Sequence, residues 1–586
     1  MKTIIRLLGF VRGNWGLFVW AFVAIIIGTA FGIAIPRMLG EGIDTVLGSG
    51  QRSFVIIAAI VIIASGALRG LAGYFQRYFN ELVSQRASYR IRNALYEKLQ
   101  GLSFAFHDQS QTGQLMSRAT VDVEAVRMFF SMGVMGMIQT VVMVIGVYYM
   151  MFSMNATLAL ITLAFVVPVG WLAATFGRKI RPIWLKVQAT LGFMGTTLEE
   201  SLAGISVVKA FSHEKADSDK FASQATTLYT EQMRAARLMA FNMPTMVLFV
   251  SLPTVAILWY GGHQVADGAM TIGQITQFIF YTALLMMPIR RLGMLVNLYS
   301  RTVSAGQRIW EILDTESDVK EKEDATELGR TRGEVTFENV SFSYGSIGPA
   351  LQNVSFNVKP GQTVALLGRS GSGKSTIANL LARFYDVTEG RILVDGTDIR
   401  DVTLESLRKN VVAAQQDVFL FSATVRENIA YGAVDADMDQ IIEVSKAAYL
   451  HDSIDALPEK YDTWVGERGD TLSGGEKQRL SIARTLLVNP SVLILDDSTA
   501  SVDSQTERLI RQALDKLIEG RTTFIITHRI PIIRNADLIL VLEDGDIVEQ
   551  GTHDSLIARN GLYKEVYEEQ LLIHQETTDD NMTEDV

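Results

Sequence analysis

The sequence contains no cysteine among its 586 residues. Disulfide bonds, thiolate metal sites and cysteine nucleophiles are therefore excluded. An excess of positive charge is also missing, because the formal net charge is -10 and the isoelectric point lies near 5.4. A surface that binds nucleic acid needs a basic face, so this charge balance argues against a nucleic-acid partner.

A cleavable signal peptide is not expected either. The first apolar stretch starts at Trp15 and is too long for the apolar region of a signal peptide, and no small-residue cleavage site follows it. The residues before it include the basic side chains of Lys2, Arg6 and Arg12. We therefore expect this stretch to be retained as a first membrane span.

Apolar residues make up 48% of the chain, and they concentrate before about Val303. Buried helices of a soluble protein are one explanation, but the number of long apolar segments far exceeds what a soluble core uses. We therefore expect contact with membrane lipid and an all-α transmembrane domain over residues 1–313. Its six spans are predicted at residues 15–38, 54–79, 128–152, 156–177, 241–262 and 272–297.

Lysine and arginine gather between spans two and three and between spans four and five, whereas the opposite loops carry almost none. The basic side of a membrane protein is cytoplasmic. Both termini are then cytoplasmic, and a bacterial cytoplasmic membrane is the expected location. Both basic stretches look helical, so we expect the spans to extend into the cytoplasm and to reverse near Phe106–Asp108 and Ala203–Ile205.

The spans contain many methionine and aromatic side chains, such as Met143, Met286 and Phe278. A flexible thioether surface suits an amphipathic or apolar small-molecule substrate. The same side chains also suit plain helix packing, so the substrate stays open.

The rest of the chain reads as an α/β domain. Residues 314–332 are charged and are interpreted as a linker, residues 333–572 as a nucleotide-binding domain, and residues 573–586 as an acidic disordered tail. In this domain an apolar strand, a glycine loop and a helix follow one another, which is the context in which a phosphate-binding loop works. The loop consists of Gly368, Arg369, Ser370, Gly371, Ser372, Gly373, Lys374, Ser375 and Thr376.

This loop predicts ATP and Mg²⁺ as cofactors. Its backbone N–H groups are expected to face the phosphates. We expect Lys374 to reach the β and γ oxygens and Ser375 to bind Mg²⁺. Asp496 ends an apolar strand and is expected to hold the same ion. His528 follows another apolar strand, which places it beside the γ-phosphate in this interpretation.

A second glycine turn carries the most specific signal. Leu472-Ser473-Gly474-Gly475-Glu476 is followed by Lys477-Gln478-Arg479, a combination that unrelated phosphate-loop proteins lack. With this signature the chain resembles the ATP-binding cassette (ABC) transporters, specifically type IV exporter halves with six spans and one nucleotide-binding domain. The resemblance implies that two such domains close head to tail on two ATP molecules. Each ATP then lies between one chain's phosphate loop and Ser473, Gly474, Gly475 and Glu476 of the other.

The resemblance also implies roles for single residues. Tyr344 resembles the aromatic residue that stacks on adenine, and Gln416 resembles the glutamine that contacts Mg²⁺ and the attacking water. Glu467 lies in a stretch similar to the exporter loop that contacts the membrane half, and Ala500–Asp503 resembles the dimer-interface loop. The two cytoplasmic reversals resemble the coupling helices of the family.

One position departs from the family pattern. Asp497 stands where such an ATPase carries a glutamate that orients the attacking water. Because its side chain is one methylene shorter, we expect Asp497, with His528 and Gln416, to hydrolyse ATP slowly. The pattern resembles the weak-site subunit of heterodimeric bacterial multidrug exporters. The expected partner is therefore a second, different ABC half-transporter.

Two other functions remain open. The first is a homodimeric flippase for lipids or drugs, which would be slow because both sites carry aspartate. The second is a regulatory subunit that senses ATP without driving transport. Glu476 is a smaller departure, since the family mostly has glutamine there, and it is expected to leave the contacts of Ser473 with the γ-phosphate almost undisturbed.

Overall fold

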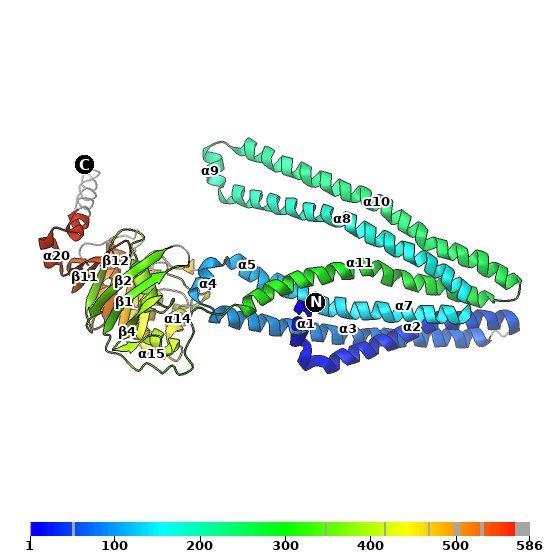
Figure 1. Ribbon diagram of the computed structural model, residues 1–586, viewed down its shortest axis with the longest axis horizontal. Coiled ribbons are helices and arrows are strands. Elements are labelled where there is room, and N and C mark those ends of the chain that lie inside the picture. The colour runs from blue at the N-terminus through cyan, green and yellow to red at the C-terminus, as the bar shows by residue number, and fades with distance from the viewer. Residues whose placement is uncertain are drawn as a thin grey trace. The chain divides into compact units, whose positions relative to one another are not determined.

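The computed structural model describes residues 2–49, 53–345, 348–414, 418–466, 469–496, 504–527 and 533–568. The chain divides into two compact units, Met1–Gln100 with Gln111–Thr315 and Gly101–Ser110 with Glu316–Val586. The first consists of long helices and the second of sheets and shorter helices (Figure 1). This is the predicted combination of an all-α domain and an α/β domain. The boundary after Thr315 falls inside the predicted linker, whose limits stay a prediction.

Every predicted span lies in a long helix. Among the described residues, five stretches are long and apolar enough to cross a membrane, and the sixth predicted span falls in α11, which starts with the shorter apolar stretch Ile272–Met286. The helices of this unit are α1 (Lys2–Leu8), η1 (Gly9–Asn14), α2 (Trp15–Ser49), α3 (Ser53–Gly101), α5 (Thr112–Ser117), η2 (Arg118–Asp122), α6 (Val123–Met128), η3 (Phe129–Val134), α7 (Met135–Met154), α8 (Ala156–Ala203), α9 (Ile205–Ala210), α10 (Glu214–Ala266) and α11 (Ile272–Asp314).

The helices extend well past their apolar runs. At 1.5 Å per residue, the 48 residues of α8 span about 72 Å, against about 30 Å for the hydrocarbon core of a bilayer. Residue chemistry sets the starts of these helices, because the Asn155 side chain accepts the N–H of Leu158 and Thr271 forms a capping box with Gln274. In Figure 1, α8 and α10 run side by side and α9 joins them, at the second predicted reversal.

Methionines of the third span pack inside the membrane unit. Met143 and Met151 are buried in one apolar cluster with Phe278 and Tyr281, and Met135 is buried in another. A side chain that is enclosed by its own chain has no surface left for a substrate. For these three methionines, packing is therefore the better interpretation.

The second unit contains two larger sheets. One is antiparallel, with the order β2-β1-β4-β5, and the other is mostly parallel, with the order β12-β11-β3-β10-β9-β6. A small third sheet pairs β7 with β8. The strands are β1 (Val335–Ser343), β2 (Pro349–Val358), β3 (Thr363–Leu367), β4 (Glu389–Val394), β5 (Thr397–Asp398), β6 (Val411–Ala414), β7 (Ala423–Thr424), β8 (Trp464–Val465), β9 (Val492–Asp496), β10 (Thr522–Ile526), β11 (Leu538–Glu543) and β12 (Asp546–Gly551).

Shorter helices surround these sheets. Strands β3, β9 and β10 are buried along nearly their whole length, as parallel strands covered on both faces are. Their apolar side chains divide between the separate core clusters of the unit. The helices of this unit are α12 (Lys374–Leu381), α13 (Leu404–Asn410), α14 (Val425–Ile429), η4 (Ala430–Gly432), α15 (Met438–Ala447), α16 (His451–Asp455), η5 (Lys460–Asp462), α17 (Gly474–Val488), α18 (Ser504–Ile518) and α20 (His553–Arg559).

The first predicted reversal is the helix α4 (Phe104–Gln109), which belongs to the second unit. The Phe104 ring stacks on the Phe384 ring with 4.9 Å between centroids. The hydroxyl of Tyr385 donates a hydrogen bond to the Asp108 carboxylate. This short segment of the chain is therefore packed against the α/β domain.

Candidate nucleotide-binding site

The predicted phosphate loop links β3 to α12 and has a backbone that needs glycine. Gly368, Gly371 and Gly373 adopt positive φ angles of 149°, 84° and 106°. A Cβ at Gly368 would lie 2.2 Å from the Leu542 carbonyl oxygen, and one at Gly373 would lie 2.8 Å from the Ala350 carbonyl oxygen. Larger residues are therefore excluded, and the backbone is held in one shape.

The loop leaves polar groups that suit an anion. The Ser372 hydroxyl is buried and has no hydrogen-bond partner among the described residues. Helix α12 begins at Lys374, and its N-cap residue Gly373 has no side chain to accept the N–H groups of the first turn. Free N–H groups at a helix start, together with a buried hydroxyl, favour a bound phosphate. The loop therefore fits the phosphates of a nucleotide.

Lys374 supplies the positive charge. Its Nζ donates to the carbonyl oxygens of Gly368 at 2.7 Å and Arg369 at 2.8 Å, so the ammonium group lies over the loop. Burial lowers the pKa of Lys374, and the negative charge of Asp496 opposes that shift. A phosphate in the loop would compensate the buried cation further.

Asp496 lies at the same edge of the sheet as the loop. Ile526 of β10 pairs with Asp496 on one side and with Leu366, two residues before Gly368, on the other. Asp496 is partly exposed and Ser375 is exposed. The described part of the chain contains no cluster of three or more His, Asp or Glu side chains for a metal. Few protein ligands are typical of Mg²⁺ that arrives with a phosphate group.

Tyr344 lies against the first turn of α12. Its hydroxyl donates to Thr376 Oγ1 and accepts from Asn379 Nδ2, both at 3.4 Å. The predicted adenine contact, the phosphate loop and Asp496 are thus brought to one region of the domain. Three predicted catalytic residues, Asp497, His528 and Gln416, lie outside the described residues, as do Glu467 and Ala500–Asp503.

The signature residues stand at the start of α17. Ser473 is the N-cap of this helix and forms a capping box with Glu476. A Cβ at Gly475 would lie 2.1 Å from Thr506 Cγ2 of α18, whereas one at Gly474 would meet nothing within 4 Å. Packing of this chain therefore requires glycine at 475 but not at 474. No hydrogen bond links these residues to the described phosphate loop.

Comparison with known proteins identifies the family. Residues 18–289 match the ABC transporter transmembrane region, and residues 351–500 match the ABC transporter family. The chain is 37% identical over 569 residues to the ABC transporter ATP-binding protein YknU of Bacillus subtilis (strain 168), with 97% of each chain covered. The chain belongs to the ABC transporters.

Two further comparisons extend this result. The transporter is 37% identical over 570 residues to the ATP-dependent lipid A-core flippase of Syntrophus aciditrophicus (strain SB), covering 97% of this chain and 94% of the relative. It also resembles the structure of a bacterial Atm1-family ABC exporter with ATP bound. The TM-score is 0.78 and the identity 31%, with 94% of this chain and 98% of the other covered. The fold is that of a type IV exporter.

Membership of the ABC transporters shows the general function of the chain. This ABC transporter is a membrane protein that couples ATP to export, and its α/β domain binds ATP. ABC exporters function as dimers.

Tyr385 is a residue that sequence reasoning missed. Its ring lies 5.1 Å from the Tyr344 ring, edge to face, and its hydroxyl bonds Asp108 of α4. Tyr385 therefore touches both the predicted adenine contact and the first cytoplasmic reversal. The only sequence signal was the pair of adjacent aromatic residues Phe384 and Tyr385 shortly after the phosphate-loop helix.

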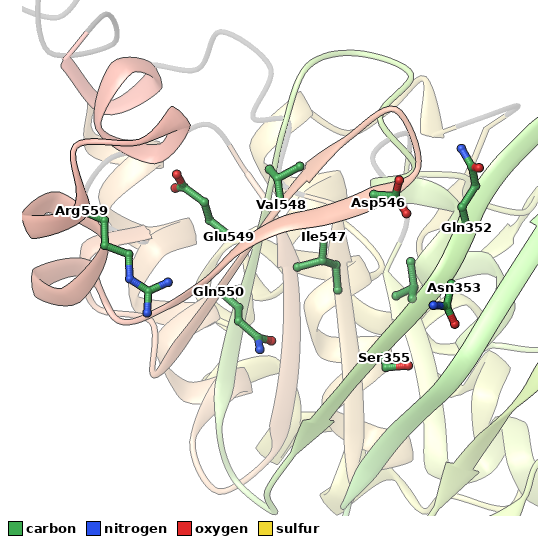
Figure 2. A pocket seen from close by; sticks show the side chains of 10 residues that line it. Gln352, Asn353, Ser355, Asp546, Ile547, Val548, Glu549, Gln550 and Arg559 are labelled. Atoms are coloured by element: carbon green, nitrogen blue, oxygen red, sulfur yellow. The ribbon is translucent and has the colours of Figure 1, made fainter.

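A separate hollow lies between β2 and β12 (Figure 2). It has a volume of about 410 Å³ and is lined by residues 352–355, 546–550 and Arg559. None of the residues predicted for nucleotide binding lines it. The carboxylate of Glu549 already accepts the backbone N–H groups of Leu562 at 2.9 Å and Tyr563 at 3.0 Å. This hollow is therefore distinct from the nucleotide site of the transporter.

Proposed function

We propose that this ABC transporter is one half of a heterodimeric exporter that moves amphipathic or hydrophobic compounds out across the cytoplasmic membrane. Both termini lie in the cytoplasm in this proposal. One observation carries it: Asp497 replaces the expected glutamate directly after Asp496, while the phosphate loop, residues 368–376, retains every residue that a nucleotide needs.

The phosphate loop would hold ATP and Mg²⁺ through residues of this chain. Lys374 lies over the loop and would neutralise the β and γ oxygens, and the buried hydroxyl of Ser372 would contact a phosphate oxygen. Ser375 and Asp496, with Gln416, would bind Mg²⁺. The bound ion supplies charge neutralisation at the phosphates.

Asp497 would make hydrolysis slow at this chain's own site. Shortening the side chain by one methylene withdraws the carboxylate by roughly 1 Å, and a displacement of that size can lower a rate on the order of 10²-fold. His528 would lie beside the γ-phosphate. The signature of this chain is complete, so Ser473–Glu476 would complete the hydrolytic site on the partner. The chain's own site would then hold ATP longer and regulate the cycle.

A homodimeric lipid flippase is the second candidate. It is favoured by the similarity to a protein named as an ATP-dependent lipid A-core flippase, because lipids are the extreme case of an apolar, amphipathic substrate. In that case two aspartates would slow both sites equally.

The composition of the native complex separates the two candidates. We expect gentle extraction of the affinity-tagged transporter from its source membranes, followed by native mass spectrometry, to give one copy of this chain and one copy of a different ABC half-transporter. A complex of two copies of this chain alone would contradict the heterodimer and support the symmetric flippase.

A further inference from the structure

The hydroxyl of Ser473 in the signature is held by Glu476. Oε2 of Glu476 accepts hydrogen bonds from both the backbone N–H and the hydroxyl of Ser473, each at 2.8 Å. The backbone N–H of Glu476 donates to Ser473 Oγ at 3.4 Å. These three contacts form the capping box that starts α17.

The carboxylate determines where the hydroxyl hydrogen points. An ionised carboxylate accepts hydrogen bonds and donates none. The single hydrogen of the Ser473 hydroxyl is therefore directed at Glu476. Phosphate oxygens are acceptors too, so Ser473 has no hydrogen to offer an incoming ATP until it breaks its bond to Glu476.

A glutamine at position 476 would behave differently. Its amide oxygen can accept the N–H of Ser473 while its NH₂ group donates to Ser473 Oγ. The hydroxyl hydrogen is then free to point at a phosphate. Glutamate also carries a negative charge, which opposes a γ-phosphate that approaches the same turn.

The sequence alone predicts that Glu476 leaves the contacts of Ser473 almost undisturbed; from its hydrogen bonds to Ser473 we propose instead that Glu476 is a positioning residue that restrains Ser473, so that this signature binds the opposing ATP more weakly than a signature with glutamine. The proposal rests on the proposed function, because Ser473 meets ATP only when two nucleotide-binding domains close. The space beside Gly474 is consistent with that approach, since a Cβ added there would meet no atom of the described residues within 4 Å. Glu476 thus sets how much ATP is needed to close the dimer.

The test compares Glu476→Gln with the unchanged chain in the full transporter, purified with its native partner and reconstituted in lipid nanodiscs. ATP hydrolysis is measured against the concentration of Mg·ATP. Since Ser473 no longer has to give up a hydrogen bond to a carboxylate before it contacts the phosphate, we expect KM for ATP to fall about three- to tenfold. The value of kcat should change much less, because the bond forms on closure.

The chain offers a matched control at α14. Thr424 and Glu427 form the same capping box, in which Glu427 Oε2 accepts the N–H of Thr424 at 2.9 Å and its hydroxyl at 3.0 Å. Glu427→Gln makes the same change of charge and cap outside the signature, so KM should not move. Glutamine serves a capping box as well as glutamate does, so both variants are expected to fold.

A second control tests whether the effect of Glu476 on KM depends on the hydroxyl of Ser473. In a Ser473→Ala background, Glu476→Gln should lower KM by a clearly smaller factor, because only the removal of the negative charge then acts. The proposal is overturned if Glu476→Gln leaves KM unchanged, if Glu427→Gln lowers it equally, or if the full effect remains without the Ser473 hydroxyl. If the transporter without any substitution hydrolyses no ATP, that result would instead contradict the proposed function.

Discussion

Lys374 shows how the phosphate loop is prepared for an anion. The ammonium group is buried, and two carbonyl oxygens of its own loop hold it. Burial lowers its pKa because the charged form loses solvent, and Asp496 compensates only in part. A bound phosphate would therefore raise the pKa of Lys374 again. Without a ligand, burial destabilises the charged ammonium group. With a phosphate bound, the same ammonium group makes a favourable ionic contact.

The rate of hydrolysis at this chain's own site is expected to depend on the side-chain length of residue 497. Asp497→Glu restores the reach of the carboxylate toward the attacking water, so turnover at this chain's site should rise on the order of 10²-fold. Single-turnover hydrolysis of radiolabelled ATP measures it, with the catalytic glutamate of the partner replaced by glutamine. Asp497→Asn is the control and should hydrolyse no faster than the unchanged chain. Equal turnover in Asp497→Glu, with ATP binding intact, would contradict the assigned role.

Helix α4 contacts the α/β domain through aromatic rings, through Ala105 and through a hydrogen bond. Phe104 stacks on Phe384, while Tyr385 donates to Asp108 and touches Tyr344. Burial, and then the contact with Asp108, raises the pKa of Tyr385 well above its usual value. The phenol is therefore protonated, and able to donate, below its ordinary pKa of about 10 and somewhat beyond it. The donor is available throughout the physiological range.

Tyr385→Phe tests whether the hydrogen bond between α4 and the α/β domain contributes to transport. The variant keeps the ring contacts but removes the donor to Asp108, which costs about 1–2 kcal/mol because the carboxylate is partly solvated. We expect the number of substrate molecules moved per ATP to fall about two- to fivefold. Transport and phosphate release, measured together in proteoliposomes, give this ratio.

Tyr563→Phe provides the matched control for that experiment. Tyr563 is also buried, and its hydroxyl bonds His553 Nδ1 at 2.7 Å in the same unit. This variant should lose similar stability but keep the ratio of transport to hydrolysis. If both variants reduce the ratio alike, α4 has no special part in coupling.

For the molecule as a whole, strong local patterns predicted the architecture well. Apolar runs long enough to span a bilayer all fall in long helices, and the strand, glycine loop and helix around Lys374 form the expected unit. These features depend on residues close together in sequence. Membership of the ABC transporters confirms the type IV exporter fold. The roles assigned to single site residues stay predictions.

Contacts between residues far apart in the chain could not be predicted from the sequence. Nothing in the chain order indicates that Asp108 meets Tyr385, 277 positions later, because folding alone sets that distance. The grouping of Gly101–Ser110 with the α/β domain was missed for the same reason. Glu476 shows a second limit of prediction from sequence, at the level of single atoms. The capping pattern is visible in the sequence, but the direction of the Ser473 hydroxyl follows only from the geometry of both side chains.

If the dimer is asymmetric, we expect two substitutions in this one chain to have unequal effects on ATP hydrolysis. Ser473→Ala weakens the partner's strong hydrolytic site, whereas Lys374→Ala weakens ATP binding at this chain's slow site. Steady-state ATP hydrolysis by the purified complex should therefore fall much further in Ser473→Ala than in Lys374→Ala. In a symmetric homodimer each substitution enters both sites, and each site needs both residues. Comparable losses of hydrolysis in the two variants would therefore point to the symmetric assembly and against the proposed heterodimer.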